Sequence, residues 1–254
     1  MEKQLYDEMF AVEEAHWWFV GRRNIVLYLL RKFLAKSKTH KNIHIADIGC
    51  GCGANILAFQ QYYTVTGFEP FDDAVSYCRK RGISVRKGAL PDAIDAERLS
   101  FDAVVMLDVL EHIKEDTKSL ERVHELLRDD GIILLTVPAY QWLYSPRDAE
   151  HHHVRRYAKP ELDKKLRHAG FEPVLLSYYN FCLFPIVAFV RIMSKIIPSR
   201  KMKSDVWVPV WGVNKVLRFI FQIEKYVLRI TGFPFGVSLI AVCRKKGENP
   251  AQYY

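Results

Sequence analysis

Short apolar runs that alternate with helical patterns constrain the fold of this chain more than any other feature. A strand, a crossover helix and a second strand normally form a parallel pair. The alternation therefore predicts an α/β fold with a mostly parallel sheet and helices on both faces. The apolar runs cover 43–48, 63–68, 83–86, 101–107 and 131–138, and the helical patterns cover 53–61, 72–81 and 115–128.

A glycine-rich turn follows the first apolar run. It reads Asp47-Ile48-Gly49-Cys50-Gly51-Cys52-Gly53, and Glu69 lies twenty positions after Gly49. Glycines at such a turn let the backbone approach a nucleotide, and a carboxylate after the second strand can accept hydrogen bonds from ribose hydroxyls. Because Gly49-x-Gly51-x-x-Ala54 also satisfies the dinucleotide fingerprint, an NAD-dependent dehydrogenase is an alternative.

The charge of Asp47 separates these alternatives. A pyrophosphate would be repelled by this carboxylate, whereas a sulfonium-bearing amino acid would be attracted to it. At about 4 Å the attraction is worth roughly 1 kcal/mol in water and about 4 kcal/mol at an effective dielectric of about 20. Asp47 therefore favours S-adenosylmethionine as the ligand.

Two later segments complete an ordered set of motifs. The first follows the glycine turn and reads Phe101-Asp102-Ala103-Val104-Val105-Met106-Leu107-Asp108-Val109-Leu110-Glu111-His112. The second covers 130–138. In this order the motifs resemble those of class I S-adenosylmethionine-dependent methyltransferases of the small-molecule type. The resemblance implies a Rossmann-like sheet of seven strands, with the final strands, 171–179 and 237–244, as an antiparallel pair.

The resemblance also implies which residues bind the cofactor. Glu69 is expected to bind the ribose, and Asp47 to order the turn and face the positive amino-acid end. Asp108, at the end of the fourth strand, is expected to face the methionine moiety or the acceptor, and it is also a catalytic candidate. The full expected set is Asp47, Gly49, Cys50, Gly51, Glu69, Ala89, Leu90 and Asp108.

Acceptor residues are expected after the fifth strand, on the ligand side of the sheet. The segment 145–157 is similar to the Asp-x-x-x-Gly-His-x-Arg-Arg-Tyr element of a bacterial and archaeal subgroup often linked with glycan and lipid pathways. On that match His153 is a general base or an acceptor clamp, with a purely structural role as the alternative. His152 stands where the element has glycine. The expected acceptor-binding residues are Trp18, His153, Arg156 and Tyr157.

Three consecutive histidines, at 151–153, raise the question of a metal site. Adjacent residues rarely converge on one ion without further ligands. We therefore expect no metal at this point of the chain.

The chain divides into three expected parts. Residues 1–40 form an N-terminal helical cap, with an amphipathic helix at 20–36 and aromatic residues ahead of it, including Trp18. The catalytic core comprises 41–179 and 237–246, and residues 180–236 form a helical insertion between the last two strands.

The insertion carries most of the net positive charge of +8, with nine Lys or Arg and two acidic residues. In its second helical pattern Lys215, Arg218, Lys225 and Arg229 form a basic stripe beside apolar residues. This stripe is either merely solvated, with the apolar faces packed inside the protein, or it touches an anionic membrane or a lipid-linked acceptor. Dimerisation is a further alternative. Because no apolar stretch approaches the roughly 20 residues that span a bilayer, peripheral binding is the form expected.

Cysteines and the first residues indicate the compartment. The five cysteines have no zinc-ligand or Cys-x-x-Cys spacing, and no secretory leader is recognisable at Met1–Glu8, so a cytoplasmic location is expected. Outside the insertion the charge is nearly balanced, and the Asn/Asp-Pro-Pro-Tyr motif of nucleic-acid methyltransferases is missing, so nucleic acid is an unlikely partner. The predicted function is methyl transfer to a small, hydrophobic or lipid-linked acceptor, with a catalytically inactive binding scaffold as the alternative.

Overall fold

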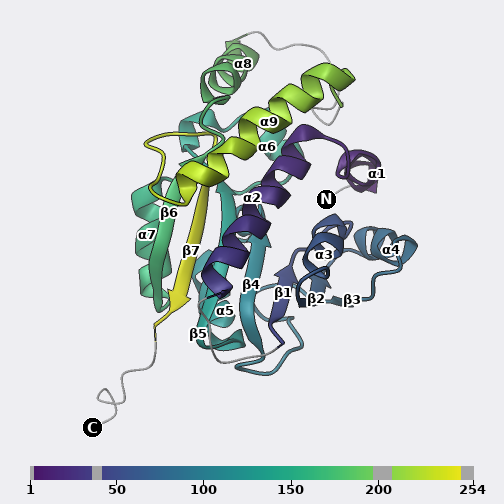
Figure 1. Cartoon of the computed structure of the whole chain (residues 1–254), viewed down its shortest axis with the longest axis vertical. Helices are drawn as coiled ribbons and strands as arrows, with labels where there is room; N and C mark the ends of the chain where they lie inside the picture. Colours follow the sequence, from purple (N-terminus) through teal and green to yellow (C-terminus); the bar gives the residue numbers. More distant parts are fainter. Residues whose placement is uncertain (1–2, 36–41, 197–207, 247–254) are drawn as a thin grey trace.

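The computed structural model describes residues 3–35, 42–196 and 208–246, and its centre is one seven-stranded sheet (Figure 1). The strand order is β3-β2-β1-β4-β5-β7-β6, and only β7 runs antiparallel to its neighbours. The predicted sheet, with one late strand placed between its neighbours, is confirmed. The strands are β1 His44–Ile48, β2 Thr64–Glu69, β3 Val85–Lys87, β4 Phe101–Leu107, β5 Leu127–Pro138, β6 Phe171–Tyr179 and β7 Ser238–Lys245.

The strand order reverses between β1 and β4, which are parallel neighbours. In open α/β sheets ligands bind at such a reversal, outside the carboxyl ends of the strands. The turn after β1 and the segment after β4 therefore meet at one edge of the sheet. Asp47 and Asp108 both belong to this edge.

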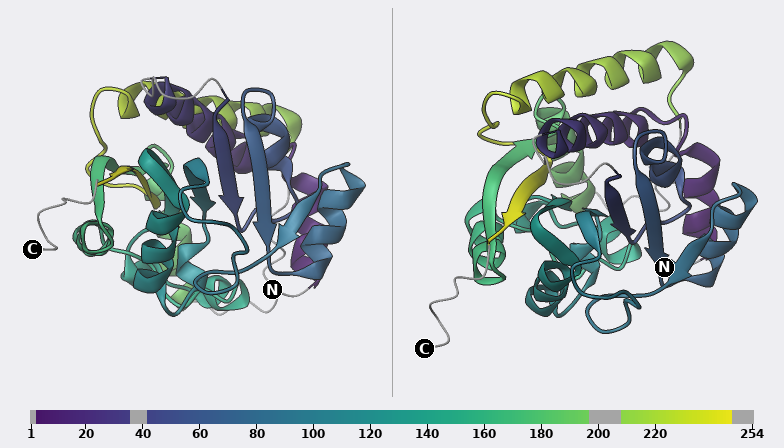
Figure 2. Two further views of the ribbon diagram at one scale, coloured as in Figure 1. Left: turned by 90° about the horizontal axis from the view of Figure 1, so that it is seen from below. Right: turned by 60° about the horizontal axis from the view of Figure 1, so that its bottom comes forward.

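Helices cover both faces of the sheet, and two are single 3₁₀ turns (Figure 2). They are α1 Lys3–Val12, α2 Trp17–Leu34, α3 Ala54–Phe59, α4 Asp72–Lys80, η1 Leu110–His112, α5 Asp116–Leu126, η2 Gln141–Leu143, α6 Pro146–Glu150, α7 Lys159–His168, α8 Phe184–Ile196 and α9 Trp211–Leu228. Side chains of α5 and α7 pack on one face, and side chains of α2, α3 and α9 pack on the other.

The insertion between β6 and β7 contributes α8 and α9, and α9 lies across the outside of α2 (Figures 1 and 2). Gly21 permits this crossing, because a Cβ at that position would lie 2.4 Å from the ring of Phe221. Phe221 is fully buried, and its ring contacts Trp17 and Tyr179. The N-terminal cap and the insertion therefore share one apolar core instead of packing separately.

A buried carboxylate fixes the start of the insertion. Glu224 of α9 accepts hydrogen bonds from the backbone N–H groups of Asn180, Phe181 and Cys182, at 2.6, 2.8 and 3.3 Å. Burial raises the pKa of Glu224 to about 7, although these three donors act in the opposite direction. The chain leaving β6 is thus held directly by α9.

The surface of α9 differs from the predicted basic stripe. Apolar side chains are exposed on it beside Lys215 and Arg229 of the stripe: Phe219 is 66% exposed, and Ile230, just after the helix, is 86% exposed. Lys225 is only partly exposed, with its ammonium 5.0 Å from the ring centroid of Tyr226. Long basic side chains can lie along apolar surface in this way. Among the described helices, none has the length and hydropathy needed to cross a bilayer.

Candidate active site

The glycine turn after β1 has the backbone conformation that its sequence predicts. Gly49, Gly51 and Gly53 have φ values of +70°, +57° and +87°, in the left-handed region that side chains disfavour. A Cβ on Gly51 would lie 2.8 Å from the terminal methyl of Met9 in α1. The turn is therefore both tightly bent and closely covered by the N-terminal helix.

Glu69 ends β2 and faces this turn. One of its carboxylate oxygens accepts a hydrogen bond from Gly51 N at 2.9 Å, and the other accepts from Phe71 N at 3.3 Å and from the Tyr6 hydroxyl at 3.4 Å. Burial raises the pKa of Glu69, and these donors oppose the shift. Tyr6 was not foreseen, because its bond to Glu69 joins residues 63 positions apart and leaves no local pattern.

Asp47 is 1% exposed, and its Oδ2 has no hydrogen-bond partner among the described residues. Burial raises its pKa to about 7, and the charge of Arg22 only partly offsets this effect. An unpartnered buried carboxylate oxygen costs free energy unless a ligand supplies a donor or a positive charge. Asp47 is therefore suited to a ligand with an ammonium group.

Arg22 of α2 joins the N-terminal cap to the end of β4. Its guanidinium forms an ion pair with Asp108 and lies 4.4 Å from the ring centroid of Trp18. Asp108 has a φ of +57°, which turns the chain sharply at the edge of the sheet. Sequence analysis assigned no role to Arg22, because an ion pair across 86 positions leaves no local pattern.

These groups fit S-adenosylmethionine. The glycine turn has no side chains at Gly49, Gly51 and Gly53, so its backbone can come close to a ligand at this edge of the sheet. Glu69 offers two carboxylate oxygens as hydrogen-bond acceptors, and Asp47 offers one carboxylate oxygen without a partner. Tyr6 and Met9 of α1 lie directly on Glu69 and Gly51, so α1 must adjust for a ribose to bond with Glu69.

Ala89 and Leu90, two of the residues expected to bind the cofactor, follow β3. Ala89 exchanges backbone hydrogen bonds with Ala93, at 3.3 and 2.8 Å, so its N–H already has a partner. Leu90 packs into the apolar core. A contact of either residue with the cofactor stays a prediction. Cys50 donates its backbone N–H to Phe68 O at 3.2 Å, which leaves its role in binding untested as well.

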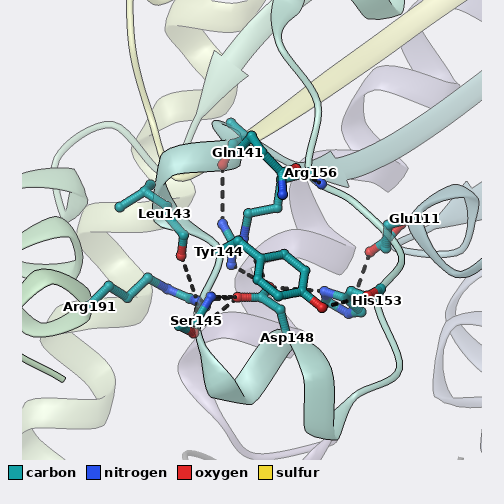
Figure 3. Close-up of polar contacts among 10 residues, drawn as sticks. Glu111, Gln141, Leu143, Tyr144, Ser145, Asp148, His153, Arg156 and Arg191 are labelled. Atoms are coloured by element: carbon teal, nitrogen blue, oxygen red, sulfur yellow. Dashed lines mark hydrogen bonds and ion pairs between the residues drawn. The ribbon is translucent and has the colours of Figure 1, made fainter. Parts of the chain in front are cut away.

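His153 lies among protein carboxylates on the acceptor side of the site (Figure 3). Its Nδ1 is 3.0 Å from Asp148 Oδ1, and its Nε2 is 4.0 Å from Glu111 Oε1. Its backbone is fixed as well, since Tyr144 donates its hydroxyl to the His153 carbonyl at 2.8 Å. The ring is therefore oriented by Asp148 and turned toward Glu111.

Asp148, in the first turn of α6, is the centre of this network (Figure 3). It accepts hydrogen bonds from His153, from Arg156 and from Arg191, which reaches it from α8 of the insertion. Burial alone would raise the pKa of Asp148, but the bonds from His153 and Arg156 and the charge of Arg191 outweigh it and hold the pKa well below its usual range. The matched element begins at Asp148, to which sequence analysis assigned no role, and Arg191 lies outside that element.

Arg156 and Tyr157 differ from their expected role as acceptor contacts. Both are buried. Arg156 bonds Asp148 and the carbonyl of Ala139, and the Tyr157 hydroxyl donates to Asp116 at 2.9 Å. In this arrangement they hold the loop that carries His153 and present no free polar group to an acceptor.

His152 adopts a φ of +58°, in the left-handed region. The motif has glycine at this position, and the backbone retains the conformation that glycine favours. The histidine therefore replaces glycine without changing the turn that positions His153.

Comparisons with known proteins agree with this geometry. Residues 21–176 match the family described as a methyltransferase domain. A Mycolicibacterium smegmatis protein named as an S-adenosylmethionine-dependent methyltransferase is 29% identical over 171 residues, which cover 64% of this chain and 62% of that protein. A ubiquinone biosynthesis O-methyltransferase of Dinoroseobacter shibae is 27% identical over 155 residues, 53% of this chain and 62% of its own length.

Solved structures show the same fold. A structure of the Haloferax volcanii Trm112 methyltransferase activator in complex with a methyltransferase gives a TM-score of 0.58 at 16% identity, over 97% of this chain and 95% of the matched one. An S-adenosylmethionine-dependent methyltransferase from Archaeoglobus fulgidus gives 0.55 at 19% identity, over 88% and 94%.

The family match covers more than half of the chain, so the chain belongs to the methyltransferase domain family, within the class I S-adenosylmethionine-dependent methyltransferases. Its cofactor is S-adenosyl-L-methionine, and the dinucleotide alternative is set aside. The matched parts span less than two thirds of the two curated relatives' own lengths.

Proposed function

We propose that the chain transfers a methyl group to a small acceptor whose nucleophilic atom carries a proton. The observation that carries this proposal is the placement of His153 between two carboxylates near the end of β4. When bound, S-adenosylmethionine supplies the methyl group, whose carbon–sulfur bond breaks with its electrons remaining on sulfur.

His153 is proposed as the group that removes the acceptor's proton. Asp148 fixes the tautomer by bonding Nδ1 at 3.0 Å, which leaves the lone pair on Nε2. As the proton moves to Nε2, the imidazolium is stabilised by Asp148 and by Glu111 at 4.0 Å. Positioned bases of this kind typically contribute about 10²–10⁴-fold to the rate.

At the donor end, Arg22 and Asp108 are proposed as positioning groups. Their ion pair fixes the turn after β4 against α2, beside the buried Asp47. Trp18 lies on the other side of the Arg22 guanidinium and is proposed to cover the acceptor. Holding donor and acceptor in line is the main requirement of methyl transfer.

Transfer of labelled methyl groups tests this proposal. The purified chain is incubated with labelled cofactor and a cell extract separated into lipid and water-soluble fractions. The His153→Ala variant is expected to lose about 100-fold or more of the transfer rate while still binding S-adenosylhomocysteine. His168→Ala, at an exposed position of α7, is the matched control.

Two outcomes would contradict the proposal. If His153→Ala transfers as fast as the His168→Ala control, the histidine is structural. If the chain binds S-adenosylhomocysteine but labels no fraction of any extract, the inactive scaffold becomes the better explanation.

The acceptor is proposed to be hydrophobic or lipid-linked, with docking of the insertion on an anionic membrane. The exposed apolar side chains of α8 and α9 support this, and so do the nine basic residues of 180–236. The similarity of 145–157 to the glycan- and lipid-linked subgroup points the same way. The outer apolar side chains are Ile186, Phe189 and Val190 on α8, and Val216, Phe219 and Ile230 on or next to α9.

Co-sedimentation with vesicles tests the docking. Phe189→Ser with Phe219→Ser is expected to reduce pelleting on vesicles with anionic lipid, and Lys215, Arg218, Lys225 and Arg229 changed to Gln are expected to reduce it too. Leu57→Ser, an exposed change on α3, is the control. Equal pelleting of all variants would contradict the docking, and loss of a dimer in Phe189→Ser with Phe219→Ser would assign the face to a second copy of the chain.

A further inference from the structure

A buried carboxylate and two imidazoles converge next to the proposed acceptor site. Glu111, His112 and His153 each offer one ligand atom, and these atoms all lie within 4.8 Å of one another. Glu111 and His112 belong to the 3₁₀ turn after β4, and His153 follows α6. The cluster therefore joins the segment that carries Asp108 to the loop that carries His153.

Glu111 is 0% exposed, and neither of its carboxylate oxygens forms a hydrogen bond with another described residue. Burial raises its pKa well above the usual range, and the negative charge of Asp108 adds to the effect. Such a group is costly in the folded state unless something supplies a positive charge. The nearest ion-pair partner of Glu111 is the imidazole of His153, and at 4.0 Å it is too far away for a hydrogen bond.

Each histidine of the cluster has one ring nitrogen already engaged. His153 Nδ1 bonds Asp148 at 3.0 Å, and the His112 ring bonds the backbone carbonyl of His152. Metal-binding histidines almost always donate their other N–H to a carboxylate or carbonyl in this way.

We propose that Glu111, His112 and His153 bind one divalent transition-metal ion, with Zn²⁺ as the best match. Two imidazoles and one carboxylate are a common ligand set for zinc and for other divalent first-row metals, and they leave open coordination positions. Metal–ligand distances of about 2.0–2.2 Å require the ligand atoms to draw together to roughly 3.0–3.6 Å. Mg²⁺ is disfavoured, because it prefers oxygen ligands.

This site departs from the sequence prediction of no metal. That prediction considered only the consecutive histidines at 151–153, of which only His153 belongs to the cluster. The other ligands come from a segment some forty positions earlier.

The metal site deepens the proposed function and rests on it for the nature of the acceptor. An open position on the ion would bind an acceptor with a hydroxyl or phenol oxygen, and the ion would lower the pKa of that group. With the ion bound, the His153 Nε2 lone pair binds the metal and no longer serves as the base proposed above, so the proton of the acidified acceptor passes to solvent. The substrate class is therefore an oxygen acceptor able to coordinate a metal.

Direct binding of Zn²⁺ tests the proposal without measuring activity. The intact chain is stripped with a chelator, dialysed against buffered Zn²⁺ and assayed for bound metal, with Mg²⁺ measured in parallel. One Zn²⁺ per chain is expected, with much weaker Mg²⁺ binding. Glu111→Gln and His112→Ala should each weaken Zn²⁺ binding by about 10-fold or more, while His151→Ala, adjacent but outside the cluster, should leave it unchanged.

Thermal unfolding of each variant, with and without Zn²⁺, shows whether weaker Zn²⁺ binding reflects loss of a ligand or loss of the fold. Zn²⁺ should raise the midpoint for the wild type and His151→Ala, and not for Glu111→Gln. Absence of stoichiometric binding by the wild type would overturn the site, and so would equal binding by Glu111→Gln, which would place the ion on other histidines or cysteines.

The metal site and the proposed function can fail separately. If the wild type binds no Zn²⁺ and still transfers methyl groups in the presence of a chelator, the metal site is wrong and His153 remains the proposed base. If the chain binds Zn²⁺ but transfers no methyl group to any acceptor, the metal site stands and the proposed function is wrong.

Discussion

The donor half and the acceptor half of the site are built in different ways. The donor half comes mainly from one stretch, in which Asp47, Gly51 and Glu69 lie within a single strand-turn-helix-strand unit. The acceptor half is held by Asp148, which bonds His153 and Arg156 of its own short segment and also Arg191 of α8, 43 positions further along the chain. A site made from contiguous chain is readable as a motif, whereas a site made around a buried charge depends on the whole fold.

The largest effect should come from removing the charge at the centre of the acceptor half. Asp148→Ala leaves two partly or fully buried arginines without their partner and should cost about 3–5 kcal/mol of unfolding free energy. Urea unfolding measures the loss. Glu97→Ala, at an exposed site, is the control, and a loss below about 1 kcal/mol would show that Asp148 is not the organising charge.

In the donor half, Glu69→Gln should change binding more than folding. Hydrogen bonds to charged groups are worth about 1.5–3 kcal/mol, so the affinity for S-adenosylhomocysteine should fall by roughly 10- to 150-fold. Calorimetry measures the affinity, with Glu97→Gln as the matched control. An unchanged affinity would contradict the assignment of Glu69 to the ribose.

Asp47 should make cofactor binding depend on pH. Its pKa is raised to about 7 in the folded chain, so the carboxyl is largely protonated at pH 6 and ionised at pH 8. A positively charged ligand prefers the ionised form, and its affinity should rise by up to about tenfold over this range. In Asp47→Asn the rise should vanish, and a rise of equal size there would assign it to another group.

The raised pKa of Asp47 affects stability in the opposite direction from cofactor affinity: the affinity rises with pH, whereas the free energy of unfolding falls. Because the folded chain holds the Asp47 proton to higher pH than the unfolded chain does, this group makes the free energy of unfolding decrease between pH 4 and 7. Asp47→Asn should remove that contribution. Urea unfolding of both proteins at pH 5 and pH 7.5 measures it, and an identical pH dependence would contradict the burial effect.

The smallest effect is expected at His152. A left-handed backbone costs a residue with a side chain about 1–2 kcal/mol, whereas glycine loses about 0.5–1 kcal/mol through its freedom in the unfolded chain. His152→Gly should therefore stabilise the fold by about 0.5 kcal/mol. Thermal unfolding measures the shift, and a clear loss of stability would show that the His152 side chain supports the loop.

Much of the fold could be predicted because its signals are local. Strands β4 and β6 have the predicted bounds, and the antiparallel β7 occupies its predicted place. Apolar runs and turn glycines within the elements themselves predict where the strands and turns lie. Boundaries of the helices differ by one or a few residues, as at α2, because capping by His16 starts that helix at Trp17 instead of residue 20.

The rest of the site could not be read from the sequence, because it depends on long-range contacts. Tyr6 reaches Glu69 across 63 positions, and Arg191 reaches Asp148 across 43. Arg156 belongs to the matched motif and was expected to bind the acceptor, and its bond to the buried Asp148 appears only in the structure. Glu111 was part of a matched motif with no role assigned, and only the structure reveals that its carboxylate is buried without a hydrogen-bond partner among the described residues.

The position of β7 also sets the order in which the chain can fold. β6 pairs with β7 along its length, and β7 lies between β6 and β5. During synthesis β6 leaves the ribosome long before β7, with all of α8 and α9 made in between. β6 therefore cannot join the sheet until the insertion and β7 have been synthesised. Pairing between segments so far apart in the sequence slows folding. An apolar helical insertion that is finished before its sheet is closed gives chaperones a long interval in which to bind it.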